Sequence, residues 1–237
     1  MTQAKQVINT MRSLGGVATF GKLNSVLDFT SWKTKTPEAS VRRIVQENPA
    51  FFRIEPGLWA LEELREKVLE GFDIKASNSE EGSPFTYTYY QGLAVEIGNL
   101  RKFSTYVPNQ DKNKKFIHTS LREVASLESI YHFTYDEILK FARTVDVIWF
   151  NNRNMPSDFF EIEHSTDMKN SLSKFYELQD FNANFYIIAP AYREDNFRET
   201  LRRSIFESIK NRVKFVSYDS ISASHSQEYR WSQTKVI

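Results

Sequence analysis

The sequence predicts an α/β protein in two parts, a small and mainly helical domain over residues 1–70 and a larger domain of alternating strands and helices over residues 85–237. Three observations lead to this division. Residues 71–84 are rich in Ser, Gly and Glu and lack apolar periodicity, which is typical of a linker. The first 60 residues contain eight Lys and Arg but four Asp and Glu, whereas the whole chain has a formal net charge of only +1. Hydrophobic residues form 41% of the 237 positions, which is enough for packed cores.

The composition excludes several classes of site and location. The sequence contains no cysteine, so it has no disulfides, thiolate zinc sites, iron–sulfur clusters or cysteine nucleophiles. The four histidines lie far apart along the chain, and no pair has the spacing of a metal site. No stretch approaches the roughly 20 apolar residues that span a bilayer, and the N-terminus lacks the apolar core of a signal peptide. We therefore expect a cytoplasmic protein with no membrane partner.

The first part of the chain predicts three helices followed by a β-hairpin. Apolar residues recur at helical spacing in three segments, and Thr36 and Pro37 suit the start of the third as N-cap and first-turn residue. Two short apolar runs flank the turn dipeptide Pro56-Gly57, which predicts a hairpin. The expected helices are residues 3–14, residues 20–27 and a third that begins at Thr36, and the expected strands are residues 51–55 and 58–61. This order is that of a winged helix-turn-helix domain.

The larger domain is predicted from strands that alternate with helices, an order that favours a mixed α/β fold. Residues 185–189 form a nearly continuous apolar run, as expected of a strand covered on both faces. The expected helices are residues 87–103, 120–127, 135–142, 167–178 and 195–211, and the expected strands are residues 104–107, 144–150, 158–165, 185–189 and 214–218.

Three acidic residues interrupt two successive strands of this domain. Asp146 lies in the otherwise apolar strand 144–150, and Glu161 and Glu163 lie in the next strand, 158–165. Side chains alternate along a strand, so Glu161 and Glu163 share a face, roughly 6–7 Å apart. If the two strands pair, all three carboxylates converge. Their mutual repulsion then favours a divalent cation with oxygen ligands, Mg²⁺ or Mn²⁺.

A second interpretation of these acids stays open at this point. Charges often alternate along a strand that is exposed on one face, so the acids could be solvated there and paired with Arg143 or Lys169. Asp146 argues against this interpretation, because an unpaired charge within an apolar strand is costly.

The order helix, strand, Asp-bearing strand, Glu-X-Glu strand, helix, strand resembles the PD-(D/E)XK nuclease core of restriction endonucleases over residues 87–218. The resemblance implies that Asp146 and Glu161 bind Mg²⁺ and that Glu96, on the first core helix, is a further catalytic acid. In that family a Lys two positions after the Glu helps to activate the attacking water. This sequence has Glu163 there instead, as some type II restriction enzymes do, which leaves the general base open.

Phosphodiester hydrolysis explains why such groups would be gathered. A divalent metal lowers the pKa of water and neutralises charge that develops on the phosphate. Glu163 is expected to orient or deprotonate the water, or to bind a second ion. Lys169 and Lys174, on the following helix, are candidates for the missing lysine, although a solvated or phosphate-contacting role fits either one.

The first domain carries a second resemblance. The segments TPEASVRRIVQEN and FFRIEPGLWAL resemble the HARE-type winged helix-turn-helix, found in chromatin proteins and fused to restriction enzymes, over residues 1–62. The third helix of such a domain enters the major groove of DNA. The implied DNA contacts are Ser40, Arg42 and Arg43 on that helix, Lys33 and Lys35 on backbone phosphates, and Arg53 on the wing. A basic face that docks another protein is the alternative.

These inferences predict a Mg²⁺-dependent type II restriction endonuclease-like deoxyribonuclease that cleaves double-stranded DNA, with the first domain recognising a sequence or a modified base. The alternative is a non-catalytic DNA-binding regulator on a decayed nuclease fold, for which Glu163 is the main argument. A protein-interaction adaptor explains the carboxylates poorly. A homodimer is a possible assembly.

Overall fold

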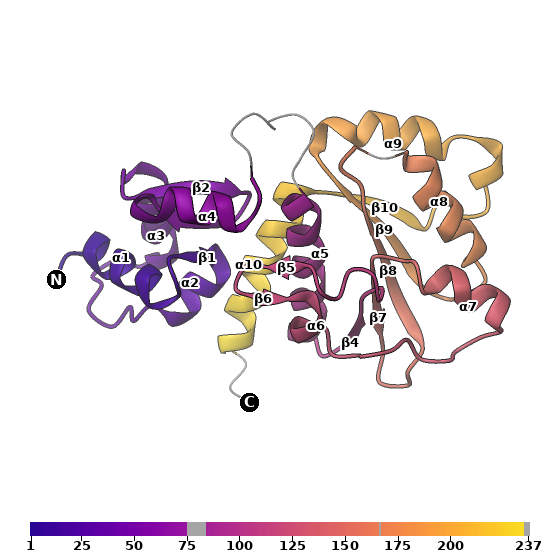
Figure 1. Ribbon diagram of the computed structural model, residues 1–237, viewed down its shortest axis with the longest axis horizontal. Coiled ribbons are helices and arrows are strands. Elements are labelled where there is room, and N and C mark those ends of the chain that lie inside the picture. Colours follow the sequence, from indigo (N-terminus) through magenta and orange to yellow (C-terminus); the bar gives the residue numbers. More distant parts are fainter. Residues whose placement is uncertain (75–83, 166, 235–237) are drawn as a thin grey trace. The chain divides into compact units, whose positions relative to one another are not determined.

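A computed structural model describes residues 1–74, 84–165 and 167–234 of the chain (Figure 1). Helices and strands both contribute to it, and strands alternate with helices, so the predicted α/β class is confirmed. Within these three segments, no helix has both the length and the apolar character needed to cross a lipid bilayer.

The chain divides into two compact units. Unit 1 comprises Met1–Ser77 together with Ser222–Ile237, and unit 2 comprises Asn78–Ile221. Most of the predicted linker, residues 71–84, lies outside the described residues, which begin again at Pro84.

Unit 1 begins with three helices and a three-stranded antiparallel sheet of order β1-β3-β2. The helices are α1 (Gln3–Ser13), α2 (Phe20–Val26) and α3 (Pro37–Glu47), and the strands are β1 (Val17–Thr19), β2 (Phe51–Glu55) and β3 (Leu58–Leu61). The predicted hairpin is confirmed, and Gly57 in its turn has a φ of 78°, a conformation that favours glycine. Pro37 occupies the first turn of α3 as predicted, whereas the Thr36 side chain makes no capping hydrogen bond.

Apolar residues from each of these helices form the core of unit 1. Val7 and Met11 of α1, Leu23 of α2, and Val41 and Val45 of α3 are almost completely buried. Each such side chain stabilises the fold by about 1.5–3 kcal/mol relative to its exposed state. The 3₁₀ turn η1 (Glu62–Leu64) and helix α4 (Arg65–Gly71), which the sequence patterns did not predict, follow the hairpin.

The C-terminal helix α10 (Tyr218–Thr234) was not predicted either, and its residues from Ser222 onward pack within unit 1. The Ser222 hydroxyl donates to the carbonyl of Pro56 at 2.7 Å, and the Arg230 guanidinium pairs with Glu38 of α3. Buried positions on α10 include the polar residues Ser222, His225 and Glu228, so an apolar periodicity could not reveal this helix.

Unit 2 is built around a five-stranded mixed sheet of order β10-β9-β8-β7-β4. Strands β8, β9 and β10 run parallel to one another, whereas β7 is antiparallel to both β8 and β4. The strands are β4 (Ser104–Tyr106), β7 (Val147–Phe150), β8 (Pro156–Ile162), β9 (Asn184–Ala189) and β10 (Val213–Ser217).

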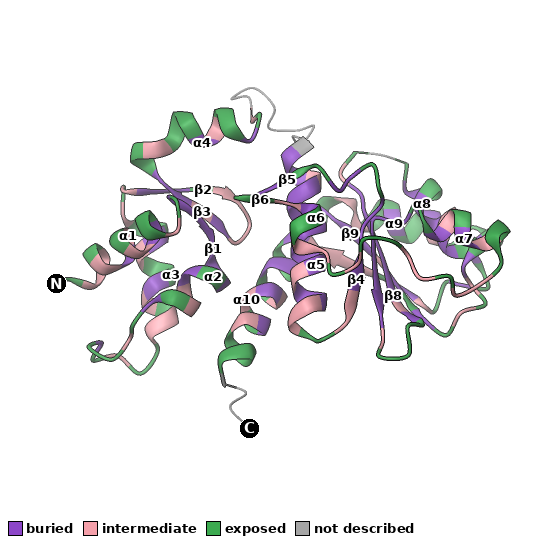
Figure 2. Ribbon diagram, turned by 60° about the horizontal axis from the view of Figure 1, so that its bottom comes forward, coloured by how far each residue is buried: buried purple, intermediate pink, exposed green. Residues whose placement is uncertain are grey.

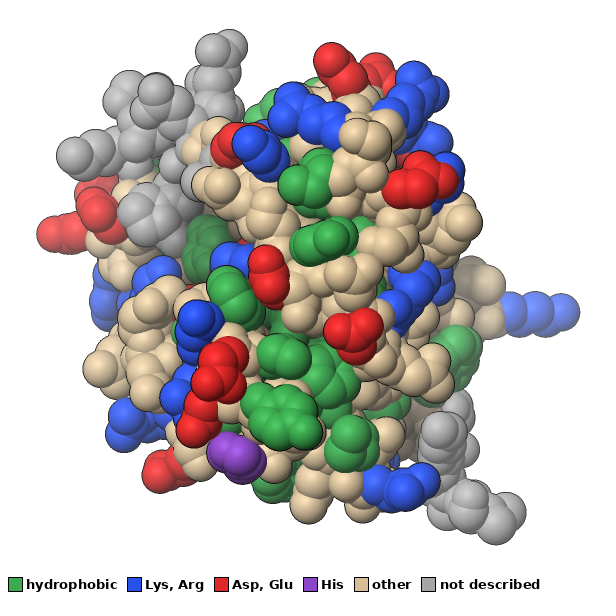
Figure 3. Space-filling view, turned by 90° about the vertical axis from the view of Figure 1, so that its right-hand side faces the viewer, with side chains coloured by type: hydrophobic (Ala, Val, Ile, Leu, Met, Phe, Trp, Pro, Cys, Tyr) green, Lys and Arg blue, Asp and Glu red, His purple; other side chains and the backbone are tan. Residues whose placement is uncertain are grey.

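Helices cover both faces of this sheet, so its strands are buried (Figures 1 and 2). Helix α5 (Pro84–Leu100) covers one face, and α7 (Asp136–Ala142), α8 (Met168–Glu177) and α9 (Glu194–Leu201) cover the other. Phe160 of β8 contacts Trp149, whose indole N–H donates to the Ala94 carbonyl of α5, so Phe160 lies on the α5 face. Phe159 and Glu161 lie on the opposite face, toward α8. Figure 3 shows the surface on that side, where acidic and basic side chains are mixed with hydrophobic ones.

Several predicted boundaries in unit 2 were wrong. The helix expected at residues 87–103 begins at Pro84, because proline lacks an N–H and is tolerated in a first turn, and it ends at Leu100. The strand expected at residues 144–150 begins at Val147, so Asp146 precedes the strand that was predicted to contain it.

Two predicted helices are shorter than expected. Residues 120–127 form only the single turn α6 (Leu121–Val124), stabilised by a capping box between Ser120 and Glu123. The helix expected at residues 195–211 ends at Leu201. The remaining short elements are the hairpin β5 (Lys115–Phe116) and β6 (Thr119–Ser120), and the 3₁₀ turns η2 (Ala191–Arg193) and η3 (Ser204–Phe206).

Candidate functional site

The three acids singled out in the sequence lie close together in unit 2. The antiparallel register pairs Val147 with Phe160, which places Asp146 beside the end of β8. The backbone N–H of Ile162 donates to Asp146 Oδ2 at 2.7 Å, and the N–H of Asp146 points to Glu161 Oε1 at 3.4 Å. Asp146, Glu161 and Glu163 are only 6%, 2% and 4% exposed. The interpretation of these residues as solvated acids on an exposed strand face is therefore wrong.

Helix α5 supplies two polar side chains to this cluster, one turn apart. The Tyr87 hydroxyl donates to Asp146 Oδ1. The Gln91 amide donates to the backbone carbonyl of Asp146 at 2.8 Å and to Asp111 Oδ2 at 3.1 Å. Asp111, which follows β4 in the chain, is 2% exposed and thus is a fourth buried acid of the region. Sequence patterns gave no signal for these three residues.

Helix α8 supplies the positive charge of the cluster. The Lys174 ammonium donates to both carboxylate oxygens of Glu161, at 2.8 and 2.9 Å, and to the carbonyl of Thr144 at 3.0 Å. Its side chain is 27% exposed, so it reaches from the acids to the surface. Lys169, the other lysine considered for this role, is exposed on the same helix. The structure therefore places Lys174 at the acids.

Burial and charge alter the protonation of these groups. Burial raises the pKa of the Asp146 carboxyl to about 6, although Lys174 opposes the shift. Burial and the neighbouring Asp146 raise the pKa of Glu161 well above its usual range. Burial lowers the pKa of Lys174, but the attraction of Glu161 and Asp146 outweighs it and the net shift is upward. Lys174 is thus an ammonium at neutral pH. Its single positive charge does not fully compensate the buried Asp146 and Glu161 carboxylates, whose pKa values stay raised.

Ser171 of α8 contacts the carboxyl groups of both glutamates. Its hydroxyl lies 2.9 Å from Glu161 Oε2 and also contacts Glu163 Oε1. A hydroxyl has one proton to donate, so it cannot serve two ionised carboxylates at once. The Arg193 guanidinium forms an ion pair with Glu163 at 3.8 Å. Ser171 therefore links Glu161 of β8 to Glu163, which follows the strand, and Arg193 adds a positive charge near Glu163.

The donor set suits a hard divalent cation that takes the rest of its ligands from elsewhere. Among the residues that the structure describes, no group of three or more His, Asp or Glu side chains is arranged to hold a metal. Mg²⁺ is usually held by only one or two carboxylates together with water and substrate phosphates. Asp146 and Glu161 are two such carboxylates, adjacent and under-neutralised, and they fit an ion of this kind.

The structure does not bring the fourth predicted acid into the cluster. Glu96 is half-buried on α5, five residues beyond Gln91, so its side chain leaves the helix about 140° away from that of Gln91. His164 follows Glu163, but its ring lies against Tyr218, with Nδ1 3.3 Å from the hydroxyl. His164 thus packs on Tyr218, beyond the end of β8, and does not face the acids.

The residues predicted to contact DNA lie in unit 1. The exposed ones are Lys33, Lys35, Arg42, Arg43 and Arg53, whereas Ser40 is half-buried and its hydroxyl donates to the Thr36 carbonyl at 3.5 Å.

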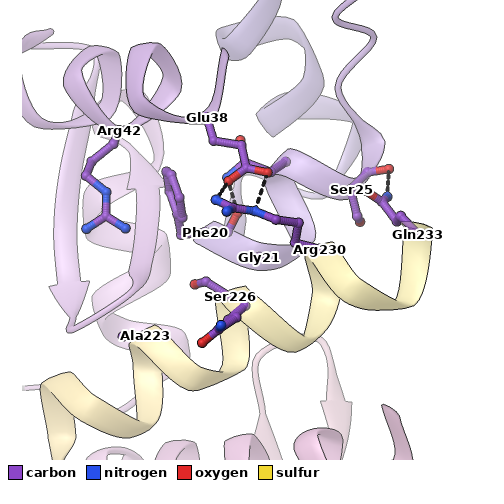
Figure 4. A pocket seen from close by; sticks show the side chains of 11 residues that line it. Phe20, Gly21, Ser25, Glu38, Arg42, Ala223, Ser226, Arg230 and Gln233 are labelled. Carbon is purple, nitrogen blue, oxygen red and sulfur yellow. Dashed lines mark hydrogen bonds and ion pairs between the residues drawn. The ribbon is translucent and has the colours of Figure 1, made fainter. Parts of the chain in front are cut away.

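Arg42 also borders a pocket of about 230 Å³ between α2, α3 and α10 (Figure 4). Its guanidinium lies 4.8 Å from the centroid of the Phe20 ring, and the Glu38–Arg230 ion pair lies on another wall. Helix α10 is therefore a neighbour of the predicted recognition helix.

Comparison with known proteins links the segment that holds the acidic cluster to a restriction enzyme. The family model of the type II restriction enzyme NmeDI C-terminal domain matches residues 73–231 of the chain. The type II restriction enzyme NmeDI of Neisseria meningitidis serogroup C is 22% identical over 143 residues, which cover 55% of this chain. The aligned region spans only 39% of that relative's length. No solved structure gives a significant match. The segment matched by the family model contains every residue of the acidic cluster.

Proposed function

Because the chain belongs to the family of the type II restriction enzyme NmeDI C-terminal domain, we propose that it is a Mg²⁺-dependent endonuclease that hydrolyses phosphodiester bonds of double-stranded DNA. The observation that carries this proposal is the buried Asp146–Glu161 pair with the Lys174 ammonium on it. The order of α5, β4, β7, β8, α8 and β9 supports a PD-(D/E)XK nuclease core for unit 2. A cytoplasmic location is part of the proposal.

In this proposal each polar group of the cluster has a separate task. Asp146 and Glu161 would hold Mg²⁺. When bound, the ion would lower the pKa of a water molecule and neutralise negative charge on the phosphate. Tyr87 and the N–H of Ile162 orient the two oxygens of Asp146. Asp111 fits the role of the further catalytic acid better than Glu96 does. Gln91 donates a hydrogen bond to the Asp111 carboxylate and another to the Asp146 backbone carbonyl, and so links the two residues.

Lys174 takes the place of the lysine that the family motif puts at position 163. As an ammonium beside Glu161, it can hold the attacking water and stabilise the charge that develops on the phosphoryl oxygens. It cannot accept a proton in that state. Glu163 is then the carboxylate that accepts the proton of the water, and Ser171 fixes its orientation.

We propose in addition that unit 1 is a winged helix-turn-helix module that binds DNA through α3. Three helices followed by the β2–β3 hairpin support the assignment, as do the two exposed arginines of α3, Arg42 and Arg43. Arg230 of α10 neutralises Glu38 at the start of α3 and so removes a negative charge from this face. Docking of another protein is the alternative outcome.

The double variant Arg42→Ala, Arg43→Ala is expected to weaken duplex binding and to lower the slope of log affinity against log salt by about 1–2, because up to two phosphate contacts are lost. Fluorescence anisotropy with a labelled duplex at several salt concentrations measures both quantities. Lys5→Ala on α1 is the control, since Lys5 is an exposed cation of the same unit but lies on another helix. Equal affinities for the double variant and the control would assign α3 to protein docking.

Incubation of the purified protein with unmethylated and methylated plasmid tests the function itself. We expect Mg²⁺ to produce linear or nicked DNA and excess EDTA to prevent it. Binding of DNA without cleavage under either condition would favour the non-catalytic regulator. Sedimentation of the same samples shows whether the active form is a homodimer.

A further inference from the structure

A short basic loop of unit 2 is held next to the acidic cluster. It follows β4 and leads into β5, and its sequence from Asp111 to Phe116 contains three lysines in four successive positions. None of the tasks assigned above to the acids and to Lys174 uses these lysines.

Buried contacts fix both ends of the loop on unit 2. Asp111 accepts a hydrogen bond from Gln91 of α5, and the Lys112 ammonium, in a residue only 6% exposed, donates to the Glu128 carbonyl. Phe116 packs on α5 at Gly92, where an added Cβ would lie 2.2 Å from the phenylalanine ring. Only glycine allows this close approach. The loop between these anchors is therefore presented in a defined position.

Lys114 is the member of the loop that faces both the cluster and solvent. Its ammonium lies 2.6 Å from Asp111 Oδ1 and 4.8 Å from the centroid of the Tyr87 ring, and its side chain is 45% exposed. The hydroxyl of the same Tyr87 donates to Asp146. A single phenol ring thus separates this cation from the carboxylate proposed to hold Mg²⁺.

We propose that Lys114 binds a backbone phosphate of the DNA next to the one that is cleaved, and that Asp111 is the positioning residue that aims it. This inference rests on the proposed function, because it takes the acids as the cleavage site. An ammonium has three donors, so Lys114 can contact Asp111 and a phosphate oxygen together. A contact to the phosphate beside the scissile one sets the register of the strand over the acids without reading its sequence.

The test compares Lys114→Ala with Lys140→Ala, which removes another exposed cation of unit 2, from α7. Binding is measured in the cleavage-deficient Asp146→Asn background with a labelled duplex and Mg²⁺. Lys114→Ala should weaken binding about tenfold. It should also lower the salt slope by about 0.9, since one phosphate contact is lost. In the wild-type background it should raise KM for DNA with kcat nearly unchanged, and Lys114→Arg should restore KM.

A binding constant and a salt slope of Lys114→Ala that match those of Lys140→Ala would overturn the proposal, as would failure of the parent protein to bind duplex. Lack of plasmid cleavage by the wild type would overturn the proposed nuclease activity alone, since the binding comparison does not depend on it. Asp111→Asn gives a second measurement: if Asp111 aims Lys114, this variant should lose part of the same affinity while keeping the unfolding midpoint of Lys140→Ala.

Discussion

Asp146→Asn is expected to remove Mg²⁺-dependent DNA cleavage, with kcat/KM at least about 10³-fold lower than in the wild type. The substitution takes away one of the two carboxylate charges that would hold the metal. It preserves the shape of the side chain, so the geometry around β7 and β8 should persist. Plasmid cleavage over a range of Mg²⁺ concentrations measures the loss.

The hydrogen bonds of this variant can be satisfied. The amide oxygen of the introduced asparagine can accept from the Ile162 N–H, and its NH₂ group can donate to the Tyr87 oxygen, which is both donor and acceptor. The expected loss of activity therefore does not arise from unfolding, and circular dichroism with a thermal melt verifies this.

The same variant should show a pH dependence that differs from the wild type. Burial raises the pKa of Asp146 from 3.8 to about 6 in the folded state. The stability that protonation of this carboxyl contributes is fully present below pH 3.8 and is lost as the pH rises through about 6. Without metal, Asp146→Asn should therefore be more stable than the wild type above pH 6, by on the order of 1–3 kcal/mol, and the difference should shrink as the pH falls toward 4.

Asp158→Asn is the matched control for Asp146→Asn. Asp158 is a second buried aspartate of unit 2, but it lies on the face of β8 opposite to Glu161, where it accepts hydrogen bonds from Ser157 and Asn184. Cleavage per folded molecule should stay within a few-fold of the wild type. Equal loss in both variants would mean that any buried charge change disables unit 2, and full activity of Asp146→Asn would remove Asp146 from the site.

The convergence of the three acids could be predicted from the sequence because it depends on local rules. Strands in succession tend to pair, and side chains alternate along a strand, so the three acids were expected to meet if segments 144–150 and 158–165 were neighbours. They do meet, although Asp146 precedes β7 and Glu163 follows the end of β8 at Ile162. Their burial could not be predicted, because it depends on α8 lying over the same face. The hairpin of unit 1 was predictable for a similar reason, since its turn dipeptide is local.

The groups that complete the cluster come from elements whose positions depend on tertiary packing. Tyr87 and Gln91 reach the acids only because α5 packs on the opposite face of the sheet, and Asp111 lies in a loop with no periodic pattern. Lys174 had a weak signal, because it is three residues beyond Ser171 and so shares its helix face. Helix α10 had none, since polar side chains occupy three of its buried positions, at Ser222, His225 and Glu228.

Lys174→Ala is expected to lower the cleavage rate by about 10²–10³-fold, because the variant loses the only ammonium on Glu161 among the described contacts. The Lys174 ammonium also competes with a metal ion for the Glu161 carboxylate. The variant should therefore need less Mg²⁺ for half-maximal rate while its maximal rate falls. A lysine with a merely structural role would not produce these opposite changes.

Lys169→Ala controls for the loss of a lysine from α8, since Lys169 is exposed on the same helix. Its maximal rate and Mg²⁺ requirement should match those of the wild type. A fully active Lys174→Ala would show that another group holds the water.

A lysine introduced at position 163 is expected to replace part of the function of Lys174. Ser171 bridges the carboxyl groups of Glu161 and Glu163, so a lysine at position 163 would extend from the same place toward Glu161. Glu163→Lys in the Lys174→Ala background should recover about tenfold of the lost rate, because it returns an ammonium to the cluster and gives position 163 the lysine of the family motif. The water must then lose its proton to solvent instead of to Glu163, so this double variant should stay well below the wild-type rate. Glu163→Gln in that background is the control, because it removes the same charge without supplying a cation. Recovery with Gln equal to that with Lys would show that the charge of Glu163, and not the missing ammonium, limits the rate. No recovery with either would place the water-holding position on α8 itself.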